Sequence, residues 1–326
     1  MNTAAWIKKG SDSLTNEYPA FDKLKKEIVE YQITSQNLHS LTKILSKMKK
    51  IANKPSLISA AYSVRDYYVS INDVYLQIFG KHLMLHYPYY QKDFESLEKR
   101  QQNLTDYCLS YVDGMADKNL LEVGCGNGTQ SLYIADIRSP QKITGIDLNP
   151  DNISIALHNK ARQQNVEFYV DDAQKLETIS DHSIDLLICI ESAFHYPHKE
   201  LFLKQISRVL KPTGKFVIAD IVNIFPNRKY LSKGWKNKMA FNHWMESDYM
   251  ASFAGSGLKI GYSENITSHI IHGYQGSSKW VRRVNFRSWI NYLGYRLYAV
   301  VHTGYNTNML KNRENYILFV GSPEKN

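Results

Sequence analysis

A short stretch from Leu120 to Gly128, reading Leu-Leu-Glu-Val-Gly-Cys-Gly-Asn-Gly, constrains the fold of this chain more than any other feature. An apolar run that ends in alternate glycines is typical of a buried strand that turns sharply into a helix. The spacing differs from the Gly-x-Gly-x-x-Gly of dinucleotide sites, and no Lys-Ser/Thr follows as in a P-loop. Alone, the glycines are equally consistent with a plain tight turn. The carboxylate of Glu122 precedes them, which suits a ligand that carries positive charge.

Acidic residues also follow the next two predicted strands. The segment 142–147 reads as a second strand that ends in Asp147, where a carboxylate can accept hydrogen bonds from a ribose diol, with the apolar Leu148 beside it. A helix is expected to start at Asn149 and to run to about residue 164. A third strand, 166–170, leads into Asp171-Asp172-Ala173, where a carboxylate can accept the amino hydrogens of adenine. A fourth strand covers 183–190. Ligands of open α/β sheets bind at such strand ends, so these acids predict one site.

The successive segments resemble the motifs of class I S-adenosylmethionine-dependent methyltransferases, in particular members that methylate sugars, polyketides and isoprenoid quinols. The resemblance lies in Leu120–Gly128, Gly145–Pro150, Asp171–Ala173, Asp185–His195 and Arg208–Asp220. It implies an α/β fold with a doubly wound, seven-stranded, mostly parallel sheet. It also implies S-adenosylmethionine as cofactor and S-adenosylhomocysteine as product. The cofactor-binding residues expected from the motifs, including two lid residues at the end, are Glu122, Gly124, Cys125, Gly126, Asp147, Leu148, Asp172, Ala173, Ile190, Glu191, Tyr75 and His86.

Methyl transfer from a sulfonium needs mainly alignment and a dry pocket. A base is needed when the acceptor, a hydroxyl or an aromatic carbon, must lose a proton. His195 follows the fourth strand and Asp220 is expected at the end of the fifth, so the two are the candidate base and its carboxylate partner. The alternative is structural: His195 packs at the strand–helix turn and Asp220 binds backbone amides.

The charge of the chain is unevenly distributed. Residues 101–222 hold 11 basic against 16 acidic residues, whereas the flanks are basic and bring the net charge to +9. Basic flanks suit an anionic substrate, an anionic membrane surface or nucleic acid, and they are equally explained by solvated surface charge. A nucleic-acid methyltransferase is disfavoured because Glu191-Ser-Ala-Phe replaces the Asp/Asn-Pro-Pro-aromatic sequence expected for exocyclic amines. A small-molecule N-methyltransferase that needs no base and a non-catalytic cofactor-binding protein are further alternatives.

Composition predicts a cytoplasmic enzyme, and the resemblance implies a small-molecule substrate of secondary-metabolite biosynthesis. No apolar run approaches eighteen residues, and the three cysteines form neither a disulfide framework nor a metal site, so no metal is expected. An anionic or aromatic small molecule is the expected partner, and aromatic helix faces leave a homodimer open.

Two regions are predicted. Residues 1–105 form a helical N-terminal extension or lid, with helices at 21–34 and 38–51. Residues 106–326 form the methyltransferase domain, with substrate-side insertions at about 223–245 and 268–314. Within the second insertion, 269–278 reads as a loop and 279–301 as a long helix, followed by a last strand at 316–321.

Overall fold

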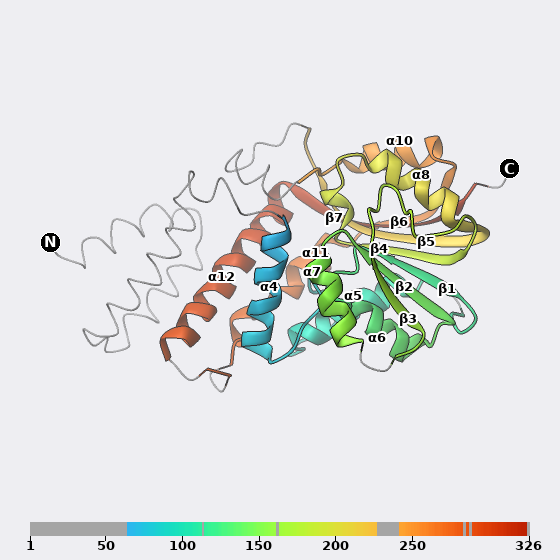
Figure 1. Cartoon of the computed structure of the whole chain (residues 1–326). Helices are drawn as coiled ribbons and strands as arrows, with labels where there is room; N and C mark the ends of the chain where they lie inside the picture. Colours follow the sequence, from blue (N-terminus) through green and yellow to red (C-terminus); the bar gives the residue numbers. More distant parts are fainter. Residues whose placement is uncertain are drawn as a thin grey trace.

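The computed structural model describes residues 64–112, 114–160, 163–226, 241–282, 285–286 and 289–324. Its framework is one seven-stranded sheet in the order β3-β2-β1-β4-β5-β7-β6 (Figure 1). The five strands that run parallel are β1 (Asn119–Val123), β2 (Lys142–Asp147), β3 (Val166–Val170), β4 (Ile184–Ile190) and β5 (Leu210–Asn223). The strand β7 (Glu314–Pro323) pairs antiparallel with both β5 and β6 (Leu258–Asn265). The predicted doubly wound, mostly parallel sheet is therefore confirmed.

Helices cover both faces of the sheet. One face carries α5 (Leu97–Leu109), α6 (Thr129–Arg138) and α7 (Pro150–Asn159), and the other carries α8 (Lys199–Val209) and α10 (Glu246–Gly255) (Figure 1). Two hydrophobic clusters fill the space between these layers, and alternate residues of each central strand belong to different clusters. Leu120 and Leu121, for example, lie in opposite clusters, which is the period-two alternation of a strand buried on both faces.

Local sequence signals set the starts of the helices that follow the loops at the strand ends. Asn149 caps α7, because its side chain accepts a hydrogen bond from the amide of Asp151 at 3.0 Å, and Pro150 occupies the first turn. Ser96 caps α5 in the same way by accepting from the amide of Lys99. Helix α6 starts behind Gly128, whose φ of +76° is left-handed.

A second helical layer stands at the C-terminal edge of the parallel strands. Helices α4 (Val64–Phe79) and α12 (Trp289–Asn312) lie side by side there (Figure 1) and share a small apolar cluster around Ile78 and Phe286. The short elements η1 (Ala193–His195), α11 (Thr267–Gly273) and η2 (Ser277–Lys279) complete the described structure. No helix among the described residues is long and apolar enough to cross a membrane.

Several predicted boundaries differ from the structure. Helix α7 ends at Asn159 rather than at about residue 164, and β7 is longer than the strand predicted at 316–321. The predicted loop at 269–278 is wrong, because α11 and η2 occupy most of it. The predicted helix at 279–301 is displaced, since α12 spans Trp289–Asn312. Gly273, read as a loop residue, ends α11 where a Cβ would lie 1.9 Å from the carbonyl oxygen of Pro88, so close packing explains this glycine. Strand β5 continues three residues past Asp220, which places Asp220 inside the sheet rather than at its edge.

Only some of the two predicted regions, 1–105 and 106–326, can be compared with the described residues. The helices expected at 21–34 and 38–51, and residues 227–240 of the first insertion, lie outside the described residues. The boundary predicted between residues 105 and 106 falls inside α5, whose residues Leu104, Cys108 and Leu109 belong to the sheet's own core.

Candidate functional site

The glycine loop between β1 and α6 lies at the base of a cavity. Gly124 and Gly126 adopt φ of +74° and +53°, a region that side chains rarely occupy. A Cβ on Gly124 would lie 2.0 Å from Oγ of Ser192, and one on Gly126 would lie 2.8 Å from Cδ1 of Leu85. Glycine is therefore required at both positions for the loop to fit beneath its neighbours.

The cavity has a volume of about 420 Å³ and extends from this loop across the ends of β1, β2, β3 and β4 to the 3-10 turn at His195. The structure brings nearly all of the predicted cofactor residues to its wall. Those lining it are Glu122, Gly124, Cys125, Gly126, Asp147, Leu148, Asp172, Ala173, Ile190, Glu191 and His86. Five lining residues carry a carboxyl group, against a single guanidinium, that of Arg65, so the wall is acidic.

Glu122 is a buried carboxyl at the end of β1. It is 3% exposed, and its Oε2 accepts a short hydrogen bond from Oγ of Ser131. Burial raises the pKa of Glu122 to about 8, because removal from water disfavours the charged form. A cation placed beside Glu122 would reverse this effect by stabilising the carboxylate.

Asp147, at the end of β2, is fixed by the loops on either side. Its Oδ2 accepts from the amide of Gly126 at 2.9 Å, and its Oδ1 accepts from the amide of Asn149 at 2.8 Å. Burial nevertheless raises the pKa of Asp147. The two amides orient the carboxylate, whose remaining acceptor capacity is available to a diol.

The two adjacent acids after β3 have different surroundings. Asp171 is 8% exposed and accepts from the amides of Asp172 and Thr178 and from the hydroxyl of Thr178, so it organises its own turn. Asp172 is half-buried, and in the described contacts its side chain accepts only from Gln174. Of the pair, Asp172 has more acceptor capacity left for a ligand.

Glu191 links the cavity to the segment that covers it. This residue has a left-handed φ of +51°, a conformation that costs a side-chain-bearing residue about 1–2 kcal/mol. Its Oε1 accepts from the backbone amide of Tyr87 at 2.5 Å and from the hydroxyl of Tyr316 at 3.0 Å, and burial raises its pKa to about 8. The neighbouring His86 is buried, which lowers its pKa to about 4 and favours the neutral ring.

Tyr75 is the one predicted cofactor residue outside the cavity lining. Its ring packs edge-on against Phe79, 6.0 Å between centroids, farther along α4. Tyr68, two turns earlier on the same helix face, lines the cavity instead.

His195, the candidate base, stands at the end of the cavity in η1. Its Nε2 lies 2.9 Å from the hydroxyl oxygen of Tyr68, and the two rings meet edge-to-face. The ring of Phe241 stacks nearly parallel to the imidazole, with 18° between planes and 5.9 Å between centroids. Asn242 binds the turn on both sides, because its amide donates to the carbonyl of Phe194 at 2.7 Å and its side chain donates to the carbonyl of His195.

Asp220 lies behind this turn and outside the cavity lining. Its carboxylate accepts from the backbone amide of Phe194 at 3.2 Å and from the hydroxyl of Tyr249 at 2.6 Å. It is fully buried, which raises its pKa, while the ammonium of the buried Lys199 opposes that rise. In the described contacts Asp220 thus supports the backbone beside His195.

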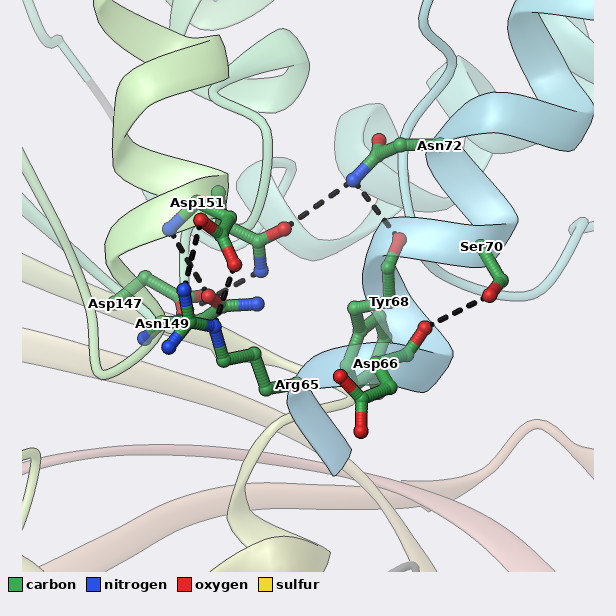
Figure 2. A network of polar contacts seen from close by, with 9 residues as sticks. Arg65, Asp66, Tyr68, Ser70, Asn72, Asp147, Asn149 and Asp151 are labelled. Carbon is green, nitrogen blue, oxygen red and sulfur yellow. Dashed lines mark hydrogen bonds and ion pairs between the residues drawn. The ribbon is translucent and has the colours of Figure 1, made fainter. Parts of the chain in front are cut away.

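Polar residues along one face of α4 connect this helix to the glycine loop and to the start of α7. The site predicted from the sequence did not include these residues. Arg65 Nε lies 2.5 Å from Oδ2 of Asp151, and Arg65 Nη2 lies 3.0 Å from Oδ1 (Figure 2). Two turns on, Asn72 donates to Oδ1 of Asn152 at 3.2 Å and accepts from Asn127 at 2.7 Å. Asn152 in turn approaches Asp147 at 3.4 Å. Residues 65, 68 and 72 are spaced by three and four, so their side chains share the helix face that points toward the cavity. This spacing is the sequence signal from which these residues could have been predicted.

Comparisons with known proteins agree with this geometry. A family model described as a methyltransferase domain matches residues 115–282. A fatty-acid O-methyltransferase of Mycolicibacterium smegmatis is 40% identical over 105 residues, which are 32% of this chain and 37% of that protein. A phthiotriol/phenolphthiotriol dimycocerosates methyltransferase of Mycobacterium leprae is 36% identical over 107 residues, 33% of this chain and 39% of that protein. The matches thus span less than half of either relative's length.

A solved structure with a similar fold is phosphoethanolamine N-methyltransferase 2 of Haemonchus contortus in complex with S-adenosyl-L-methionine. It superimposes with a TM-score of 0.67 at 17% identity, covering 82% of this chain and 61% of that one. At this identity the likeness shows the fold alone.

Proposed function

We propose that this chain transfers a methyl group to a small-molecule metabolite. The chain belongs to the methyltransferase domain family of class I S-adenosylmethionine-dependent enzymes. The acceptor atom is an oxygen or an activated carbon. One observation carries the proposal: the acidic cavity above the glycine loop is lined at one end by His195, whose imidazole contacts Tyr68 and Phe241.

The cavity wall fits S-adenosylmethionine. Glu122 would bind the cationic amino acid end, Asp147 the ribose hydroxyls and Asp172 the adenine amino group, with Leu148 against the adenine face. Leu148 is 69% exposed, so its apolar side chain is accessible to an adenine ring. When bound, the cofactor supplies an electrophilic methyl group on a sulfonium.

The chain's own residues align the acceptor and take its proton. His195 is the proposed general base, because it lines the cavity and its ring is fixed by contacts with Phe241 and Tyr68. Asp220 is proposed as a positioning residue that holds the Phe194 amide. The names of the mycobacterial relatives, one of which methylates fatty acids on oxygen, support a lipid-like acceptor.

The second helical layer is proposed as the substrate side. Phe241, at the end of the insertion predicted at 223–245, contacts His195, and α12 of the insertion predicted at 268–314 packs against α4. The homodimer stays a prediction, which sedimentation of the full chain would test.

Calorimetry and a methyl-transfer assay test the function. We expect S-adenosylmethionine to bind, Asp147→Ala to weaken binding at least tenfold, and His195→Ala to keep binding while turnover falls by about 10²–10⁴-fold. A chain that binds neither S-adenosylmethionine nor S-adenosylhomocysteine would contradict the proposal. Unchanged turnover in His195→Ala would refute the base alone.

A further inference from the structure

Tyr68 approaches the proposed base more closely than any acid of the site does in the described contacts. Its hydroxyl oxygen lies 2.9 Å from Nε2 of His195, the nitrogen that a general base would use. Both residues line the cavity, so an acceptor that reaches Nε2 must also meet the tyrosine hydroxyl.

The hydroxyl is held in place from both sides along α4. One turn before Tyr68, Arg65 forms two contacts with Asp151 on α7. One turn after it, the buried Asn72 bonds both Asn127 of the glycine loop and Asn152 of α7. Its side chain also donates to the backbone carbonyl of Tyr68 at 3.0 Å (Figure 2). A residue fixed between two such attachments is positioned by the cofactor-binding loops themselves.

The surroundings keep the Tyr68 proton on its oxygen. Burial raises the pKa of this hydroxyl, and the carboxyl groups of Glu191, Asp147 and Asp220 raise it further. Tyr68 therefore acts as a proton donor rather than as a base.

We propose that Tyr68 is a catalytic residue that relays the proton of a neutral acceptor hydroxyl to Nε2 of His195. In this step the acceptor O–H bond breaks and its proton passes to the tyrosine oxygen, while the tyrosine's own proton passes to Nε2. The acceptor oxygen bonds to the methyl carbon as the carbon–sulfur bond breaks, which leaves a methyl ether and S-adenosylhomocysteine. Tyr68 ends unchanged, and the imidazolium returns its proton to water. This relay rests on the proposed function.

Tyr68→Phe tests the relay, because it keeps the ring that packs on His195 and removes only the hydroxyl. The acceptors are 4-nonylphenol, its 2-nitro derivative and palmitate. We expect kcat on nonylphenol to fall about 10²-fold, with a much smaller loss on the nitrophenol, which is largely ionised at neutral pH. A second measurement uses mixtures of light and heavy water. If two protons move in the rate-limiting step, kcat of the wild type should depend on the deuterium fraction along a curve. The kcat of Tyr68→Phe, in which one proton moves, should depend on it linearly.

Tyr262→Phe is the matched control. Tyr262 lies on the edge strand β6, outside the cavity lining, and its hydroxyl donates to Glu264. This variant should keep wild-type kcat, and calorimetry should give the same cofactor affinity for all three proteins.

The outcomes separate the relay from the function on which it rests. Equal losses on both phenols, or kcat within twofold of wild type in Tyr68→Phe, overturn the relay. A wild-type protein that methylates palmitate but neither phenol also overturns it, while methyl transfer stands. Failure to bind the cofactor at all overturns the proposed function itself.

Discussion

Glu122→Gln is expected to make the cofactor-free protein more stable while it weakens cofactor binding. The fold holds the Glu122 carboxyl with a pKa of about 8, against an ordinary value of 4.5. Keeping that proton at pH 7 costs about 3 kcal/mol relative to the unfolded chain. Glutamine has the same shape, is neutral at every pH, and can still accept from Ser131. The substitution therefore removes the free-energy cost of keeping the carboxyl group protonated in the folded, cofactor-free protein.

The sign of the pH dependence follows from the raised pKa. Because the folded state binds the Glu122 proton more tightly, stability from this group is complete below pH 4.5 and is lost as the pH rises toward 8. The difference in free energy of unfolding between Glu122→Gln and wild type should be under about 1 kcal/mol at pH 5. It should grow by up to about 4 kcal/mol by pH 8. Other buried carboxyl groups, such as Glu191, cancel in this difference.

Urea unfolding at pH 5, 7 and 8 measures the effect, and calorimetry at pH 7 measures binding. Loss of a charge-assisted hydrogen bond predicts a 10- to 100-fold weaker affinity for S-adenosylmethionine. Glu98→Gln is the control: this exposed residue pairs with Lys81, and its loss should change stability by less than about 1 kcal/mol. Parallel curves for Glu122→Gln and wild type across the three pH values would refute the reasoning.

Three further substitutions test the loop and the α4 attachments. Gly128→Ala should lower the free energy of unfolding in urea by about 2–4 kcal/mol, because φ is +76° and a Cβ would lie 2.7 Å from both Ala156 and Phe168; a loss under about 1 kcal/mol would contradict this. Asn72→Ala should cost about 2 kcal/mol by leaving buried asparagine partners unmatched, and unchanged melting would count against the network. Arg65→Ala removes an exposed ion pair and should leave the free energy of unfolding almost unchanged, so a clear loss in the same assay would assign it a different role.

The sequence predicted the structure best where the residue type itself determines the local backbone conformation. The glycine loop, the Asn149 cap and the acids after β2 and β3 are local signals, so the strands around them were placed within one residue of the structure. Cofactor-side residues then follow, because carboxyl ends of parallel strands share an edge.

The features that the sequence did not predict depend on contacts between side chains that are far apart in the sequence. Tyr75 and Tyr68 are both aromatic residues of one helix, and only the tertiary attachments of Arg65 and Asn72 determine which one lines the cavity. Gly273 gave a loop signal for a position that packing explains. The partner of Nε2 of His195 could not be read from the sequence for the same reason, since Tyr68 is 127 residues away.

The place of β7 in the sheet has a consequence for how the protein is made. This strand, Glu314–Pro323, fills the gap between β5 and β6, and Tyr316 within it donates to Glu191 at the cavity. A nascent chain that has emerged only as far as α12 has two strands with exposed, unpaired edges and a strained Glu191 without one of its donors. Folding during translation should therefore stall at an open, association-prone stage until β7 leaves the ribosome.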